Sequence, residues 1–240
     1  MTDSDDLLRA VIANPEDDTP RLIFADWLDD RGDHARAEFI RVQIERWNRF
    51  GDQKRFSDPD YLQLALREKT LFSLNHDRWM EPLRKKGEPF QSRDTHGIYQ
   101  RGFIHEVWMR ARTFLSRSEK LFRRTPCRAL KLTQANEDEF AEFSALPILS
   151  VLKSLDLTPI RWTIPKMETF LASQPLKSLA RIEIQIEQWP NEYMPELQSK
   201  TRWENTEIVF HSQLELKTEN EVPVYICEIP RWMNQNRSKD

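Results

Sequence analysis

Five hexapeptides decide the fold of this 240-residue chain: IHEVWM (104–109), CRALKL (127–132), LKSLDL (152–157), LARIEI (179–184) and NTEIVF (205–210). In the first four, apolar residues occupy positions one, four and six, and the fifth keeps only the last two. Their fourth residues are 107, 130, 155, 182 and 208, which gives steps of 23, 25, 27 and 26 residues. A period in the twenties is typical of leucine-rich-repeat-like solenoids.

Apolar residues at helical spacing follow each of the first four hexapeptides. They are Phe114, Leu115, Leu121 and Phe122, then Phe140, Phe143 and Leu146, then Met167, Phe170 and Leu171, and finally Met194 and Leu197. Strands and helices that alternate at this period predict a parallel sheet with helices on one side. We therefore expect residues 98–240 to form an irregular leucine-rich-repeat-like solenoid, with residues 214–229 as its terminal cap.

Residues 1–97 predict a helical module that precedes the solenoid, so the expected fold class is α/β. Capping residues, prolines and apolar stripes indicate four helices, over about residues 4–13, 20–30, 33–50 and 59–74. In the second and fourth helices, the residues expected to face the core are Leu22, Ile23, Trp27, Leu28, Leu62, Leu66 and Leu71. The polar segment 85–95 predicts a mobile loop.

Composition and charge indicate a cytoplasmic protein. The chain is 39% apolar and 31% charged, with a net charge of −3. No apolar run approaches the roughly 18–20 residues that span a bilayer, and the acidic N-terminus lacks the pattern of a secretory signal. Cys127 and Cys227 stand in apolar contexts, so we expect two buried thiols in a reducing compartment.

Positive charge gathers in residues 110–131, which hold eight bases and one acid, a net charge of +7. A basic amphipathic helix in this segment fits three roles: a solvated face, a docking site for an acidic protein surface, or a nucleic-acid interface. The slightly negative overall charge argues against nucleic acid. Residues 1–33 hold ten acids and three arginines, a net charge of −7, so the two regions are also candidates to face each other.

No motif indicates catalysis, a cofactor or a metal. The chain has no glycine-rich phosphate loop and no G-x-S-x-G motif, and its five histidines lack zinc-ligand spacing. Around Gly32, a calcium loop would place Trp27 and Arg31 at positions that need oxygen ligands. We expect no enzyme, no cofactor and no metal site, and we expect the acids of this region to cap helices and solvate the surface.

The segment PRLIFADWLDDRGD (20–33), continued by RAEFIRVQ (36–43), resembles the bacterial repeat-companion domain, an N-terminal module that precedes leucine-rich-repeat-like regions. The middle of the chain is similar to such proteins at Arg67-Glu68, Leu71, His76, Trp79, Pro82-Leu83 and Arg101-Gly102-Phe103. The resemblance implies no activity, cofactor or catalytic residue. The chain departs from regular leucine-rich repeats because Ala135, Ile160, Glu187 and Gln213 stand where an Asn usually closes the strand.

The residues between the apolar anchors predict an interaction surface, because side chains alternate between the two faces of a strand. We expect the following to bind a partner protein: Trp108, Arg110, Lys131, Asp156, Arg181, Glu183 and His211. Among them Trp108 is a candidate anchor; the alternative is that these residues only solvate the sheet. The predicted function is a non-catalytic protein-interaction module, and the alternative function is a nucleic-acid-associated regulator that uses residues 110–131.

Overall fold

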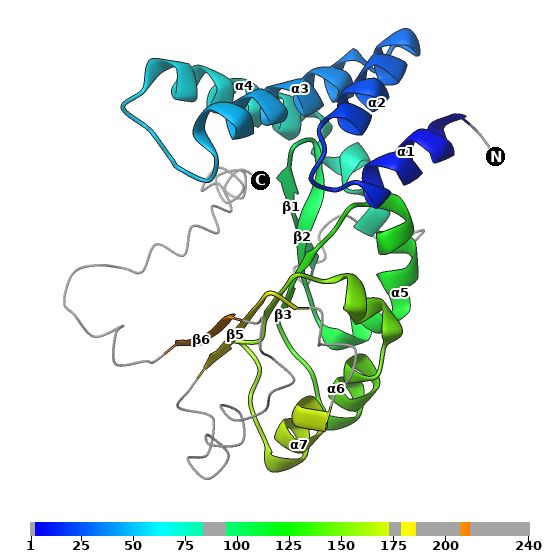
Figure 1. The fold of residues 1–240 in the computed structure, drawn as a ribbon, viewed down its shortest axis with the longest axis vertical. Coiled ribbons are helices and arrows are strands. Elements are labelled where there is room, and N and C mark those ends of the chain that lie inside the picture. The colour runs from blue at the N-terminus through cyan, green and yellow to red at the C-terminus, as the bar shows by residue number, and fades with distance from the viewer. Residues whose placement is uncertain (1–2, 84–94, 173–178, 186–206, 212–240) are drawn as a thin grey trace, which may run out of the picture.

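The computed structural model describes residues 3–83, 95–172, 179–185 and 207–211 (Figure 1). The fold is mixed α/β, with a six-stranded sheet whose strands lie in the order β1-β2-β3-β4-β5-β6. The first pair forms an antiparallel hairpin and every later pair is parallel. The strands are β1 (Thr95–Gln100), β2 (Phe103–Met109), β3 (Ala129–Leu132), β4 (Ser154–Asp156), β5 (Arg181–Gln185) and β6 (Glu207–His211).

Three helices cover one face of the parallel strands (Figure 1): α5 (Ala111–Arg124), α6 (Glu137–Ser144) and α7 (Ile164–Ala172). The 3₁₀-helix η2 (Pro147–Val151) leads into β4. Helix α6 begins with a capping box, in which Asn136 accepts from the Glu139 backbone N–H at 2.8 Å while the Glu139 side chain accepts from the Asn136 N–H. The predicted parallel strands with intervening helices are therefore confirmed over the described residues.

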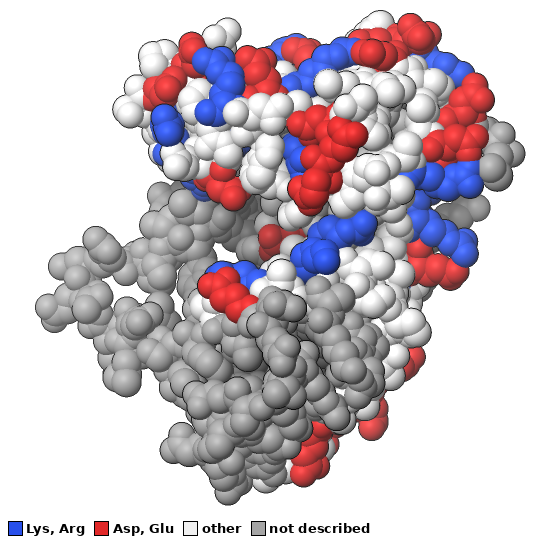
Figure 2. Space-filling model, in the orientation of Figure 1, with Lys and Arg blue, Asp and Glu red and all other residues white. Residues whose placement is uncertain are grey.

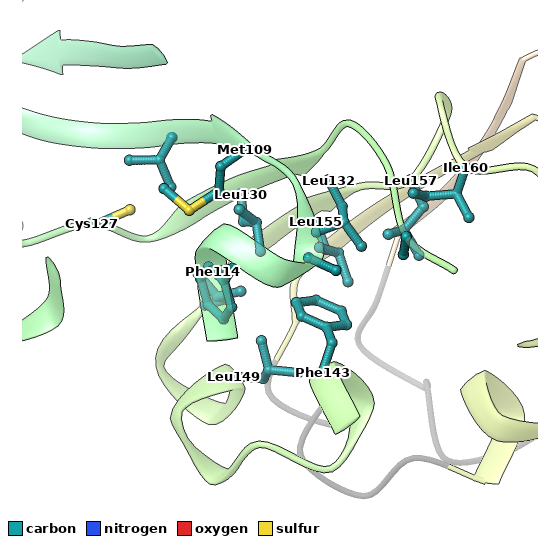
Figure 3. Close-up of a cluster of buried hydrophobic side chains, with 14 of the residues drawn as sticks. Met109, Phe114, Cys127, Leu130, Leu132, Phe143, Leu149, Leu155, Leu157 and Ile160 are labelled. Carbon is teal, nitrogen blue, oxygen red and sulfur yellow. The ribbon is translucent and has the colours of Figure 1, made fainter. Parts of the chain in front are cut away.

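The anchors of the first four hexapeptides form the core between the sheet and these helices. Val107, Leu155 and Ile182 are 0% exposed and Leu130 is 1% exposed. Figure 3 shows Phe114 of α5 and Phe143 of α6 pointing toward Leu130 and Leu155. The other buried anchors are Ile104, Met109, Cys127, Leu132, Leu152, Leu157, Leu179 and Ile184. The side chains of Ile208 and Phe210 lie outside the described residues.

A buried lysine stabilises the turns that lack the usual asparagine. Lys166 of α7 is 5% exposed, and its Nζ donates to the carbonyl oxygens of Ala135 at 2.8 Å and Arg161 at 3.0 Å. These carbonyls follow β3 and β4, so one side chain supplies a hydrogen-bond donor to the backbone of two successive turns. Burial lowers the pKa of Lys166.

The N-terminal part consists of α1 (Asp3–Ala13), α2 (Thr19–Asp30), α3 (His34–Phe50), α4 (Pro59–Trp79) and the 3₁₀-helix η1 (Glu81–Leu83). Asp33 caps α3 by accepting from the Arg36 N–H, and Asp58 caps α4 by accepting from the Asp60 N–H. The four predicted helices are all present, and α4 continues to Trp79 rather than ending near Leu74.

Two of the predicted helix faces are correct only in part: Trp27 and Leu28 of α2 pack in the core as expected, but other predicted residues do not. Leu22 and Ile23 are 39% and 49% exposed, because α2 instead buries the stripe that contains Arg21, Ala25 and Leu28. In α4, Leu62 and Leu66 are exposed while Leu71 is buried as expected. The helix is turned by polar contacts to α3: Glu68 accepts from Gln43 Nε2 at 2.7 Å and from Arg46 Nε at 2.6 Å. The spacing of apolar residues cannot predict a buried helix face that includes polar and charged residues.

The tip of the β1–β2 hairpin joins the helical part to the sheet. Arg101 and Gly102 both have positive φ, 50° and 86°, as a two-residue turn of type I′ requires. The Gly102 N–H donates to Gln43 Oε1 at 2.7 Å, and Arg36 donates to the Gly102 carbonyl. A Cβ at Gly102 would lie 2.8 Å from the Ile40 Cα, so only glycine allows α3 to approach this closely.

Arg101 holds the loop between α1 and α2 from the same turn. Arg101 is 5% exposed, and its side chain donates to the carbonyls of Glu16 at 3.0 Å and Pro15 at 2.9 Å. The boundary predicted between residues 97 and 98 falls within β1. The predicted loop at residues 85–95, except Thr95, and the predicted cap at residues 214–229 lie outside the described residues.

Candidate protein-binding face of the sheet

The strands present a second face, opposite α5, α6 and α7, on which side chains form two cross-strand rows. The Trp108 row follows the pairing of His96, Trp108, Lys131, Asp156, Glu183 and Val209, and the Glu106 row follows that of Ile98, Glu106, Ala129, Ser154, Arg181 and Glu207. We call these two rows together the outer face. Neighbouring strands lie about 4.8 Å apart, so successive residues of a row are cross-strand neighbours.

Lys131 is fixed in the middle of the Trp108 row. Its Nζ forms an ion pair with Asp156 and lies 5.2 Å from the centroid of the Trp108 ring. The Lys131 and Asp156 side chains are only 15% and 18% exposed. Asp156 Oδ1 also accepts from the Thr158 N–H at 2.8 Å and the Thr158 hydroxyl at 2.7 Å, so the pair is tied to the turn after β4.

Arg181 organises the β5–β6 end of the outer face. Its Nε donates to Glu183 Oε1 at 3.0 Å, and its Nη1 donates to Glu207 Oε2 at 2.6 Å. The side chains of Arg181 and Glu207 are 40% and 63% exposed. Solvent screens such pairs, so this end is a wetter surface than the region around Lys131.

Strand β1 adds an apolar end to the outer face that the hexapeptide pattern did not predict. Ile98 pairs with Glu106 and is 41% exposed, and the His96 ring packs edge-on against Trp108 with centroids 6.3 Å apart. The sequence signal for this strand is the segment THGIYQ (95–100) directly before the two-residue turn Arg101-Gly102. A two-residue turn between strand-like segments indicates a hairpin.

Glu106 is the carboxylate of the outer face that lies closest to this apolar end. The Trp108 indole N–H donates to Glu106 Oε1. Burial raises the pKa of Glu106, and repulsion from Asp156 and Glu183 acts in the same direction, while the hydrogen bond from Trp108 and the charge of Lys131 oppose it. The protein therefore holds an acid where its ionised form is disfavoured.

Five of the seven predicted site residues lie together on the outer face: Trp108, Lys131, Asp156, Arg181 and Glu183. Arg110 lies one residue beyond β2, where it is the exposed N-cap of α5. His211 pairs with Gln185 at the end of β6, and its side chain lies outside the described residues. The alternation of side chains along the strands therefore predicts that these five residues share one face of the sheet. It does not apply to Arg110, which lies outside the strand.

The basic segment 110–131 does not form one continuous basic surface. Arg117 Nη1 donates to the Leu83 carbonyl at 2.8 Å, Lys120 pairs with Glu81 at 2.7 Å, and Arg128 Nη2 donates to the Ile12 carbonyl at 3.0 Å. Lys131 lies on the outer face instead. Much of this positive charge thus binds the helical part of the chain.

Acidic residues of the N-terminal helices are largely engaged with arginines. Asp26 and Asp29 both pair with Arg41, at 2.6 and 2.5 Å, and Glu38 pairs with Arg67 at 2.5 Å. Figure 2 shows acids and bases interspersed over α1–α4 rather than separated by sign. The acidic excess predicted for this region is therefore not a single-sign surface on the face shown.

Over the described ranges, no three His, Cys, Asp or Glu side chains come close enough to hold a metal ion. Cys127 is buried, and burial raises the pKa of its thiol to about 12, so it is an unreactive core residue. Among the same residues, no helix has the length and apolar content needed to cross a bilayer.

No protein-family model, no curated protein and no solved structure matches the chain.

Proposed function

We propose that this chain is a non-catalytic protein-interaction module of the cytoplasm, in which a repeat-companion-like helical module precedes an irregular leucine-rich-repeat-like solenoid. The partner protein binds to the outer face of the sheet. One observation carries the proposal: the residues between the apolar anchors line up across the strands, from Trp108 through Lys131 and Asp156 to Glu183.

The composition of the outer face supports protein recognition. It combines an aromatic side chain with charges that are already held in place, Lys131 by Asp156 and Arg181 by Glu183 and Glu207. Fixed polar groups around a Trp match the usual anatomy of interface hot spots, since little side-chain entropy is lost on binding. Solenoid-type sheets commonly present such an extended binding surface.

The test is affinity capture from the native cell lysate with a matched pair of double variants. Trp108→Ala with Arg110→Glu alters the outer face and its border, whereas Arg112→Glu with Arg124→Glu alters two exposed positions of α5. We expect the first variant to lose the partner by roughly tenfold in quantitative mass spectrometry, and the second to retain it. Circular dichroism establishes that both variants are folded.

The opposite pattern contradicts the proposal. Retention by the outer-face variant with loss by the α5 variant would favour the alternative function, nucleic-acid association through residues 110–131. A gel-shift series at increasing salt then separates the two, because phosphate binding weakens steeply with salt. The contacts of Arg117, Lys120 and Arg128 within the chain do not favour that alternative.

A further inference from the structure

The described residues of the outer face carry an excess of negative charge. Four carboxylates, Glu106, Asp156, Glu183 and Glu207, share the two rows with only two cations, Lys131 and Arg181. Four acids and two bases give a net charge of −2. A surface with this balance attracts a cationic partner and disfavours an anionic one.

Glu106 differs from the other three carboxylates in its contacts. Asp156 pairs with Lys131, while Glu183 and Glu207 pair with Arg181. Within the described part of the chain, Glu106 has no salt bridge and accepts one hydrogen bond, from the Trp108 indole N–H. A carboxylate has room for about four hydrogen bonds, so Glu106 retains acceptor capacity.

The surroundings of Glu106 suit a long cationic side chain. Its row neighbours are Ile98, which is 41% exposed, and Ala129, which is small and almost buried. The half-buried Trp108 ring stands two residues further along the strand. Arg and Lys place their methylene stems on apolar surface and direct only the head group to a charge. Ile98 and Trp108 offer that surface beside the Glu106 carboxylate.

An arriving cation also removes an unfavourable feature of the unbound protein. Burial and the neighbouring acids disfavour the charged form of Glu106. The resident cations relieve this only in part, because Lys131 acts on Glu106 from within its ion pair with Asp156, and Arg181 is held by two glutamates. A guanidinium or ammonium group that excludes water beside Glu106 would form a charge-assisted hydrogen bond, which is stronger than a neutral one.

We infer that the partner segment bound by the outer face presents an arginine or lysine to Glu106, with the stem of that residue and an adjacent apolar side chain against Trp108 and Ile98. This inference rests on the proposed function and specifies the chemistry of its ligand. The partner is thus a cationic, partly apolar peptide segment of another protein.

The experiment uses two synthetic seven-residue peptides as probes. Both contain alanine with one leucine, and they differ only in carrying arginine or its neutral analogue citrulline. Binding to the full chain is followed by the indole ¹H–¹⁵N resonance of Trp108, which is assigned by its loss in Trp108→Phe. This resonance reports directly on the hydrogen bond to Glu106.

We expect the arginine peptide to shift the Trp108 resonance saturably and to bind at least roughly tenfold more tightly than the citrulline peptide. Glu106→Gln removes this preference. Glu207→Gln, at an exposed position of the same row, leaves the affinity within about twofold because surface charges contribute little. Equal affinity for the two peptides, no shift with either, or an unchanged preference in Glu106→Gln would overturn the inference.

Capture from lysate separates this inference from the proposed function. If Glu106→Gln retains the partner while Trp108→Ala with Arg110→Glu loses it, the outer face binds a protein but not through a cation at Glu106. If both variants retain the partner, the proposed function itself is wrong. Loss in both supports the two together.

Discussion

The two faces of the same sheet differ more sharply than any two elements of the chain. On the helix-covered face, Leu130, Leu155 and Ile182 are at most 1% exposed. The residues next to these anchors along the strands lie on the outer face and form two ion pairs, Lys131 with Asp156 and Arg181 with Glu183. Their side chains are 15–40% exposed. The comparison teaches that the anchors stabilise the fold while the residues between them are released from packing. Those residues are where a recognition surface can vary.

The largest expected effect comes from breaking the covered face. Leu155→Ala removes a side chain with no exposed area from the core under α5 and α6, and we expect a loss of about 2–5 kcal/mol in the free energy of unfolding. Ser154→Ala, at the preceding residue on the outer face, is expected to cost less than about 0.5 kcal/mol. Urea denaturation followed by circular dichroism measures both, and equal losses would remove the distinction between the faces.

The next effect tests the turn that brings β1 to the outer face. Gly102→Ala places a Cβ 2.8 Å from the Ile40 Cα at a φ of +86°, and we expect a loss of about 2–4 kcal/mol from clash and backbone strain. Gly32→Ala is the control, because its φ of +81° is similar but nothing lies within 4 Å of the added Cβ. Only the strain, about 1 kcal/mol, is expected there. Thermal unfolding distinguishes them, and equal losses would show that the turn is not tightly docked on α3.

A smaller effect concerns the ion pair of the outer face. We expect Lys131→Met and Asp156→Asn to show a coupling energy on the order of 1 kcal/mol in a double-mutant cycle, since the pair is mostly buried but reaches solvent. The free energies of unfolding of the two single variants and the double variant supply the measurement. A coupling energy of zero would mean that the pair does not hold Lys131 in place, and that the outer face is not preorganised.

The smallest expected effect is a pH dependence that belongs to Glu106. Its pKa in the folded protein is raised above the usual 4.5, so the folded state binds more protons than the unfolded state between these two values. The stability that this group contributes is fully present below pH 4.5 and is lost as the pH rises through the folded pKa. Relative to Glu106→Gln, the wild-type chain should therefore lose stability as the pH rises above 4.5. Parallel curves for the two proteins over that range would contradict it.

Particular residues show what the sequence could predict about the site. Val107, Leu130, Leu155 and Ile182 repeat at nearly constant spacing, and period-two alternation then places the residues next to them on the opposite face. The same alternation fails at Arg110, because β2 ends at Met109 and the chain turns into α5.

Strand β1 was missed for a physical reason. It runs antiparallel, lies outside the repeat, and its register shifts between Ile98 and Tyr99, which leaves His105 as an extra residue in β2. A β-bulge breaks the simple alternation. The prediction fails at Leu22 because α2 buries Arg21 instead, and at Leu66 because α4 turns Glu68 toward Gln43 of α3. A hydrophobic pattern carries no information about such polar partners.

The most direct test of the outer face as a binding site is site-specific photo-crosslinking. Benzoyl-phenylalanine replaces Trp108 in one protein and Arg112, an exposed residue of α5, in a second, and each is irradiated in the native lysate. The account predicts a crosslinked protein partner from position 108 that is absent from position 112. A partner crosslinked only from position 112, or no crosslink from position 108 while the partner is still captured, would contradict it.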